Sequence, residues 1–124
     1  MADRLLIVDD SVSMRQMIQI ILKGAGYAVD EAGSGPEALQ KLSDEHTVVI
    51  TDYNMPEMNG VELIEKIRAG GVNKAIPILM LTTESEESKR QAGKRAGATA
   101  WLTKPFQKGE LVDVVRKVAA TVEF

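Results

Sequence analysis

The chain has 124 residues, a formal net charge of −3 and no cysteine. This length predicts one domain over residues 1–124 that buries most of its apolar surface. The lack of cysteine excludes disulfides, thiolate metal sites and a thiol nucleophile, and it fits a reducing, cytoplasmic location. Lys and Arg are scattered among acids, which is untypical of nucleic-acid binding. The N-terminal run MADRLLIVDD is too short and too acidic for a signal peptide or a membrane span.

Five segments are predicted to form β-strands. Three are apolar runs without polar alternation, which is typical of interior strands in a parallel sheet covered on both faces: LLIV at 5–8, VVI at 48–50 and ILML at 78–81. Two weaker candidates lie at 27–32 and 98–102, and the first of these alternates as an edge strand does.

Helical periodicity fills the segments between and after these strands. The first helix is predicted from a capping box of Ser13 and Gln16 and from an apolar stripe at Met14, Met17, Ile18, Ile21, Leu22 and Ala25. Four more helices are predicted at about 36–42, 61–68, 84–96 and 108–121. Strand and helix thus alternate five times, which predicts an α/β domain, a doubly wound (βα)5 fold with a parallel sheet between two helix layers.

Polar side chains follow the predicted strands at one end of the sheet. They are Asp9 and Asp10, then Asp52, then Thr82 and Thr83, then Lys104 with Pro105. Each of these groups alone is an ordinary helix start or surface turn. Because such sheets bind ligands at the carboxyl ends of their strands, the groups together indicate a site.

The residue types at this edge favour phosphoryl chemistry. Three converging carboxylates repel one another and demand a cation, and oxygen ligands without Cys or His favour a hard ion such as Mg²⁺. Lys104 adds a positive charge and a threonine adds a hydroxyl, so the group suits a dianionic phosphoryl oxyanion. Asp52 is then the expected nucleophile, since carboxylates form aspartyl phosphates.

Four stretches resemble the receiver domain of two-component response regulators, with stand-alone, CheY-like chemotaxis regulators the nearest match: LLIVDD, TDYNMPEMNG, MLTTES and AGATAWLTKPF. The resemblance covers essentially the whole chain and implies a flavodoxin-like sheet with strand order 2-1-3-4-5. It implies a phosphoacceptor switch with only self-catalysed phosphotransfer and autodephosphorylation, a sensor histidine kinase as phosphodonor, and no output domain.

The same resemblance assigns roles to individual residues. Asp52 would be the phosphoacceptor, and Mg²⁺ would be held by Asp10, Asp52 and the backbone carbonyl of Asn54. Asp9 would act at the same metal, largely through water.

Further roles concern the phosphoryl group itself. The hydroxyl of Thr82 would move toward it, and Lys104 would contact one of its oxygens. A cis peptide bond is expected before Pro105. The backbone N–H groups expected to complete the oxyanion site are those of Tyr53, Asn54 and Thr83.

We expect the signal to pass from Thr82 to the surface formed by the segments 84–96, 98–102 and 108–121. Trp101 stands where similar receivers carry a switch aromatic, although a plain core or surface tryptophan is an equally good interpretation. The 84–96 helix has only small apolar residues (Ala92, Gly93, Ala96), which suits a loosely held switch element.

The expected partner of this surface is a downstream protein, with the flagellar motor switch as one candidate, and the chain is expected to be a monomer. Arg90 and Gln91 occupy positions where flagellar regulators carry apolar residues, so a phosphorelay shuttle or a phosphate sink stays open. His46 has no metal-ligand partner in sequence and is expected to be exposed.

Two other classes of site compete with this interpretation. The run from Gly33 to Ala38 fits a dinucleotide-binding G-x-G-x-x-A, but Pro36 lacks an N–H where a phosphate needs one. A haloacid-dehalogenase-type phosphatase shares the residue types in another order and needs a second acid where this chain has Asn54, which is no general acid.

Overall fold

The computed structural model describes residues 3–83 and 87–120. Strands and helices alternate as predicted: β1 (Arg4–Val8), α1 (Val12–Gly24), β2 (Ala28–Ala32), α2 (Gly35–Lys41), β3 (His46–Asp52), α3 (Gly60–Ala69), β4 (Ile78–Thr82), α4 (Glu87–Ala96), β5 (Ala100–Thr103) and α5 (Lys108–Ala119). The predicted helix start at 84–86 and the predicted last residue of the fifth helix, Thr121, lie outside the described residues.

The five strands form one parallel sheet in the order β2-β1-β3-β4-β5, which confirms the implied topology and the edge position of β2. The register pairs Val8 with Thr51, Asp52 with Leu81, and Thr82 with Thr103. The carboxyl ends of β1, β3, β4 and β5 therefore lie close to level at one edge of the sheet.

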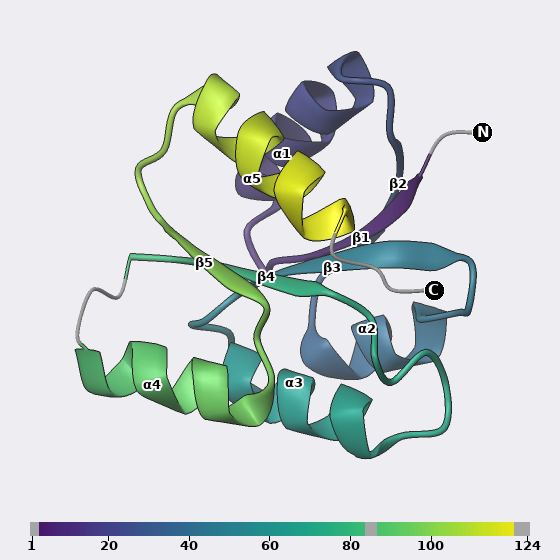
Figure 1. Ribbon diagram of the computed structural model, residues 1–124, viewed down its shortest axis with the longest axis vertical. Coiled ribbons are helices and arrows are strands. Elements are labelled where there is room, and N and C mark those ends of the chain that lie inside the picture. Colours follow the sequence, from purple (N-terminus) through teal and green to yellow (C-terminus); the bar gives the residue numbers. More distant parts are fainter. Residues whose placement is uncertain (1–2, 84–86, 121–124) are drawn as a thin grey trace.

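Helices cover both faces of the sheet, with α1 and α5 on one side and α2, α3 and α4 on the other (Figure 1). Because successive strand residues point to opposite faces, β1 divides its apolar side chains between two cores. Leu5 and Ile7 pack with α1 and α5, whereas Leu6 and Val8 pack on the other side. This two-sided burial explains why the interior strands lack polar alternation.

The start of α1 differs from the prediction. Ser11 is the N-cap residue, and its hydroxyl accepts a hydrogen bond from the backbone N–H of Met14. The predicted capping box at Ser13 and Gln16 is wrong, because the Asp9 carboxylate accepts from the N–H of Ser11 and fixes the turn before it. Met17, placed on the core stripe, is also 42% exposed, since the buried face of α1 centres on Ile18 and Leu22.

His46 begins β3 and is buried, so its predicted exposure is wrong. Its Nε2 lies 2.8 Å from Oδ2 of Asp30 on β2, and its Nδ1 accepts from the backbone N–H of Ser43 at 3.1 Å. Asp30 also accepts from Arg4 at 3.0 Å, so a side chain from the middle of β2 links the amino ends of β1 and β3. A partner 16 residues away is invisible to local sequence patterns.

The helix α4 buries little of its own apolar surface. Gly93 is the one buried residue among those described for α4, which confirms the expected lack of a large apolar anchor. Its C-terminal end is held from outside by Arg68 of α3, whose guanidinium donates to the carbonyl oxygens of Lys74, Ile76 and Gly97 at 2.6–2.7 Å.

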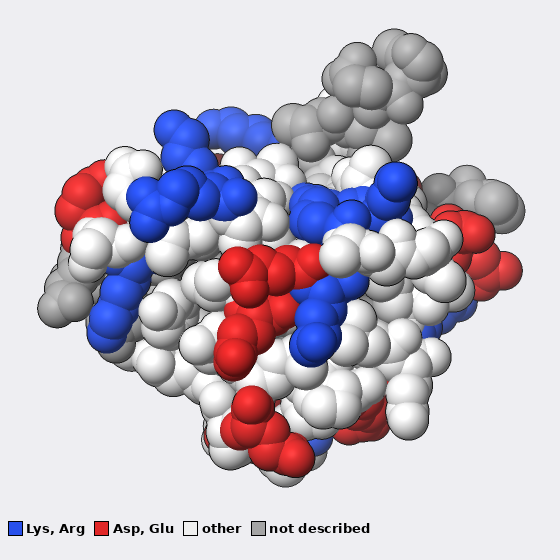
Figure 2. Space-filling model, turned by 90° about the horizontal axis from the view of Figure 1, so that it is seen from below, with Lys and Arg blue, Asp and Glu red and all other residues white. Residues whose placement is uncertain are grey.

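The face formed by α3 and α4 is seen from outside in Figure 2. On its described part, Lys and Arg side chains are interspersed with Asp and Glu rather than massed into one patch. Among the described residues, no helix is both long and apolar enough to cross a membrane.

Candidate functional site

The carboxyl ends of β1 and β3 bring three carboxylates together. Asp9 and Asp10 directly follow β1, and Asp52 is the last residue of β3. One carboxylate oxygen from each residue lies within 4.8 Å of the other two. Asp9 is buried, Asp52 is half-buried and Asp10 is exposed, so the group faces solvent on the Asp10 side. An all-oxygen group of this kind is suited to hold a hard cation.

Lys104 reaches the same group from the end of β5. Its Nζ lies 3.4 Å from Oδ2 of Asp9 and 3.5 Å from Oδ2 of Asp52, and only 12% of its side chain is exposed. Its backbone N–H donates to the carbonyl oxygen of Thr82 at 2.8 Å, and the peptide bond to Pro105 is cis, as expected. One ammonium group therefore faces two of the three carboxylates.

The charge of Asp52 is poorly solvated. Burial raises its pKa, the ammonium of Lys104 counteracts this, and the negative charge of Asp9 raises the pKa further, so the net pKa lies above its ordinary value. The backbone N–H of Tyr53 donates to Oδ1 of Asp52 at 2.8 Å and favours the charged form. A further cation at this edge would relieve the remaining repulsion.

Asp9 is fixed by contacts that the sequence does not reveal. Oδ1 accepts from the N–H of Ser11 at 2.9 Å, which leaves Oδ2 toward Lys104. Arg15 donates to the backbone carbonyl of Asp9 and pairs with Glu31 at 3.1 Å. Arg15 was missed in sequence because nothing in its surroundings distinguishes it from an ordinary helix arginine.

The loop after Asp52 turns back against the end of its own strand. The N–H of Gly60 donates to the carbonyl oxygen of Tyr53 at 2.8 Å. A Cβ at Gly60 would lie 2.5 Å from the backbone oxygen of Asp52 and 2.8 Å from the sulfur of Met80, so only glycine fits. Met58 of this loop packs beside Gly35 of α2.

The remaining predicted site residues have different surroundings. Thr82, the last residue of β4, is fully buried, whereas Asn54 and Thr83 are exposed. The structure thus places the predicted switch hydroxyl in the interior, and the residues expected to contribute backbone groups at the surface of the same edge.

The glycine motif before α2 is an ordinary helix start. The N–H of Gly33 donates to Oε1 of Glu37 at 2.8 Å, and the hydroxyl of Ser34 caps the N–H of Glu37 at 3.2 Å. Because these groups satisfy one another, the motif gives no support to dinucleotide binding.

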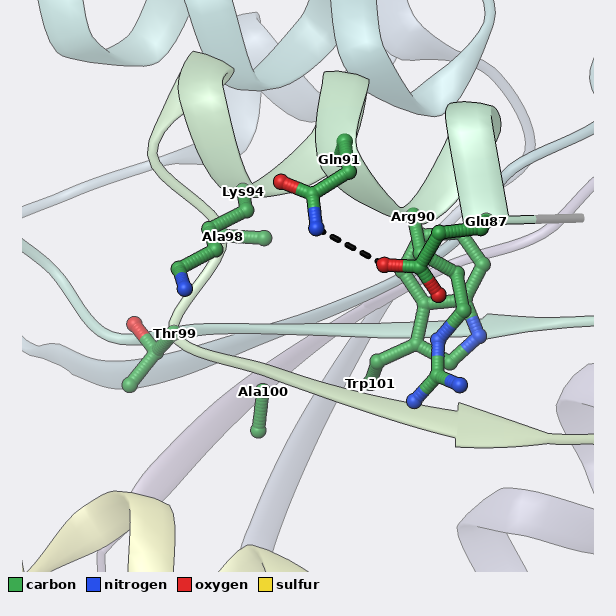
Figure 3. A pocket seen from close by; sticks show the side chains of 8 residues that line it. All are labelled: Glu87, Arg90, Gln91, Lys94, Ala98, Thr99, Ala100 and Trp101. Carbon is green, nitrogen blue, oxygen red and sulfur yellow. Dashed lines mark hydrogen bonds between the residues drawn. The ribbon is translucent and has the colours of Figure 1, made fainter.

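Trp101 lies beneath α4 and lines a groove of about 370 Å³ between α4 and β5 (Figure 3). The guanidinium of Arg90 lies 5.7 Å from the centre of the Trp101 ring. The indole Nε1 of Trp101 is buried with no hydrogen-bond partner among the described residues. Its ring also faces that of Tyr53, with centroids 6.4 Å apart. This aromatic contact could not be predicted from sequence patterns, since the two residues are far apart in the chain.

Comparison with known proteins agrees with this geometry. The family model described as the response regulator receiver domain matches residues 5–116. The chain belongs to this family. It is 42% identical over 121 residues to chemotaxis protein CheY1 of Helicobacter pylori strain J99, covering 95% of this chain and 98% of that protein.

Two further relatives show how widely the receiver domain is used. The crystal structure of Vibrio cholerae chemotaxis protein CheY4 superposes with a TM-score of 0.88 at 45% identity, covering 95% of this chain and 99% of that one. A transcriptional regulatory protein CpxR homolog of Haemophilus influenzae is 35% identical, but the match covers 93% of this chain and only 49% of that protein. The receiver family therefore also includes proteins about twice as long as the part that this chain matches.

Proposed function

We propose that this receiver accepts a phosphoryl group from a sensor histidine kinase onto Asp52 and signals by phosphorylation-dependent protein binding, in chemotaxis. The observation that carries the proposal is the convergence of Asp9, Asp10 and Asp52 with the ammonium of Lys104 at one sheet edge. Such an edge can neutralise an incoming dianion while presenting a carboxylate oxygen as nucleophile.

The donor set fits Mg²⁺. Carboxylate oxygens of Asp9, Asp10 and Asp52 lie within 4.8 Å of one another, and a hard ion of this kind prefers oxygen ligands and keeps several waters. Asp10, Asp52 and the backbone carbonyl of Asn54 would hold it, with Asp9 acting largely through water. When bound, it supplies positive charge next to the phosphoryl oxygens.

In the reaction, an oxygen of Asp52 forms a bond to phosphorus while the bond from phosphorus to the imidazole nitrogen of the donor histidine breaks. The electron pair of that bond stays on the imidazole. Lys104, already 3.5 Å from Asp52, stabilises the transferred oxygens. The backbone N–H groups of Tyr53, Asn54 and Thr83 supply further donors.

The output surface proposed for this receiver comprises α4, β5 and α5. The hydroxyl of Thr82 moves toward the phosphoryl group, and Trp101 responds at the groove beneath α4. Support comes from the weak anchoring of α4 and from two relatives named as chemotaxis proteins. A motor switch protein is one candidate occupant of this surface.

A phosphorelay shuttle or phosphate sink is the second candidate function. It is favoured by the polar lining of the groove, where Gln91 donates to Glu87 at 2.7 Å and Arg90 is exposed. Pull-down with beryllofluoride-loaded protein separates the two: retention of a motor switch protein supports chemotaxis, and retention of a histidine phosphotransferase supports the shuttle.

The acceptor role is tested by intact-mass measurement after incubation with acetyl phosphate and Mg²⁺. We expect a mass gain of one phosphoryl group in the wild type, and no gain in Asp52→Asn or after chelation of the metal. Equal gain in Asp52→Asn would contradict the proposal. Sustained turnover of small phosphate esters that persists in Asn54→Ala would favour a phosphatase instead.

A further inference from the structure

Tyr53 contacts the acidic site through its backbone and Trp101 through its side chain. Its N–H donates to Oδ1 of Asp52 at 2.8 Å. Its ring faces that of Trp101 with centroids 6.4 Å apart and planes tilted by 53°. Both rings are half-buried and pack against the core between the sheet and the α2, α3 and α4 layer. The side chain of Tyr53 therefore connects the backbone at the acidic site with the ring of Trp101.

The helix α4 rests on these two rings. Nζ of Lys89 lies 5.8 Å from the centre of the Tyr53 ring, and the guanidinium of Arg90 lies 5.7 Å from that of Trp101. A Cβ on Gly93 would lie 3.1 Å from Trp101, which shows how closely the helix backbone approaches the indole. Because α4 has no large buried side chain among its described residues, these ring contacts help to hold it against the sheet.

We propose that Tyr53 is a positioning residue that couples the phosphoryl group on Asp52 to Trp101 and α4, in parallel with Thr82. The inference rests on the proposed function. When Asp52 is phosphorylated, its carboxylate becomes an uncharged acyl group. The negative charge then lies on the oxygens of the attached phosphoryl group. The N–H of Tyr53 then turns to a phosphoryl oxygen as its better acceptor, and the attached ring shifts against Trp101.

The coupling requires a flat ring at position 53 and not its hydroxyl. An aromatic side chain has two torsions and a fixed plane, so it transmits a backbone shift as a change of tilt against the indole. Tyr53→Phe keeps that plane, whereas Tyr53→Leu removes it and keeps an apolar side chain. The two variants therefore separate the ring contact from general packing.

The test uses Trp101, which is the only tryptophan of the chain and gives a single indole N–H signal in NMR spectra. Mg²⁺ and beryllofluoride are added, and the BeF₃ group on the Asp52 carboxylate stands in for the phosphoryl group. We expect the displacement of the indole signal in Tyr53→Leu to be below about half that of the wild type, with Tyr53→Phe close to the wild type.

Tyr27→Leu is the matched control, because Tyr27 is the only other tyrosine and packs in the core on the opposite face of the sheet. We expect its displacement to equal that of the wild type. Fluorine NMR reports separately whether beryllofluoride has loaded Asp52 in each variant.

Full displacement in loaded Tyr53→Leu would overturn the inference, and so would failure of that variant to load, because Tyr53 would then act before the coupling step. A wild type that does not load, or an Asp52→Asn variant that responds equally, refutes the proposed function itself. The two failures are thus distinguishable.

Discussion

The negative charge of Asp52 destabilises the folded state. Its pKa is raised chiefly by burial and also by Asp9, so the ionised form is less stable in the folded chain than in the unfolded chain. We expect Asp52→Asn to raise the thermal midpoint at neutral pH in the presence of a chelator. Adding Mg²⁺ should stabilise the wild type more than the variant.

Calorimetry with and without Mg²⁺ measures both effects. Asp113→Asn, which removes an exposed carboxylate on α5, is the control. It should change neither the thermal midpoint in chelator nor the stabilisation by Mg²⁺. A lower midpoint for Asp52→Asn in chelator would contradict the electrostatic account of the site.

Gly60 is required by the close return of the loop to its strand. We expect Gly60→Ala to lose about 1–3 kcal/mol of unfolding free energy, since the added methyl group overlaps backbone that cannot easily move. Gly109→Ala, where a Cβ meets nothing within 4 Å in α5, is the matched control. It should gain up to about 1 kcal/mol from helix propensity. Denaturant titration measures the unfolding free energy of both variants. Equal stability of the two would be inconsistent with the steric argument.

At the scale of elements, α4 depends on its neighbours. Arg68 of α3 satisfies three backbone carbonyl oxygens, including that of Gly97 after α4. We expect Arg68→Ala to lose about 1–3 kcal/mol and to speed hydrogen exchange in α4 before the other helices. Lys66→Ala, an exposed change on the same helix, should leave exchange in α4 unaltered. Uniform acceleration across all helices would refute this local role.

How much the sequence reveals differs between elements. The interior strands were predictable because two-sided burial leaves an uninterrupted apolar run, as in β4. The start of α1 was not, because three serine or aspartate residues in a row could cap it, and the Asp9 carboxylate that binds the N–H of Ser11 selects Ser11 over Ser13. The weak anchoring of α4 was visible as small residues, but its support by Arg68 comes from another helix.

At the scale of the whole molecule, the site was predictable because parallel strands carry their carboxyl ends to one edge. This rule brought Asp9, Asp10, Asp52 and Lys104 together before any distance was known. The opposite end of the sheet was not predictable, since the pairing of His46 with Asp30 depends on strand neighbours far apart in sequence.

The contacts of Asp30 at that opposite end should make the stability of the folded state depend on pH in the acid range. Burial raises the pKa of Asp30, but hydrogen bonds from His46 and Arg4 outweigh it, so the net pKa is lowered. The ionised form is therefore favoured in the folded state. Its stabilising contribution is complete above the unfolded pKa, about 3.9, and is lost as pH falls through the folded value.

Unfolding free energies of the wild type and Asp30→Asn, measured between neutral and strongly acidic pH, check this dependence. We expect the wild type to be more stable at pH values above about 4 and the difference to shrink below it. A difference that grows on acidification would mean that the sign is wrong.

The central claim is that Asp52, and no other carboxylate of the edge, carries the phosphoryl group. The most direct measurement is borohydride reduction of the phosphorylated chain, which converts an aspartyl phosphate to homoserine, followed by peptide mapping. The account predicts homoserine at position 52 and unmodified Asp9 and Asp10. Homoserine at position 9 or 10 with Asp52 intact would contradict it.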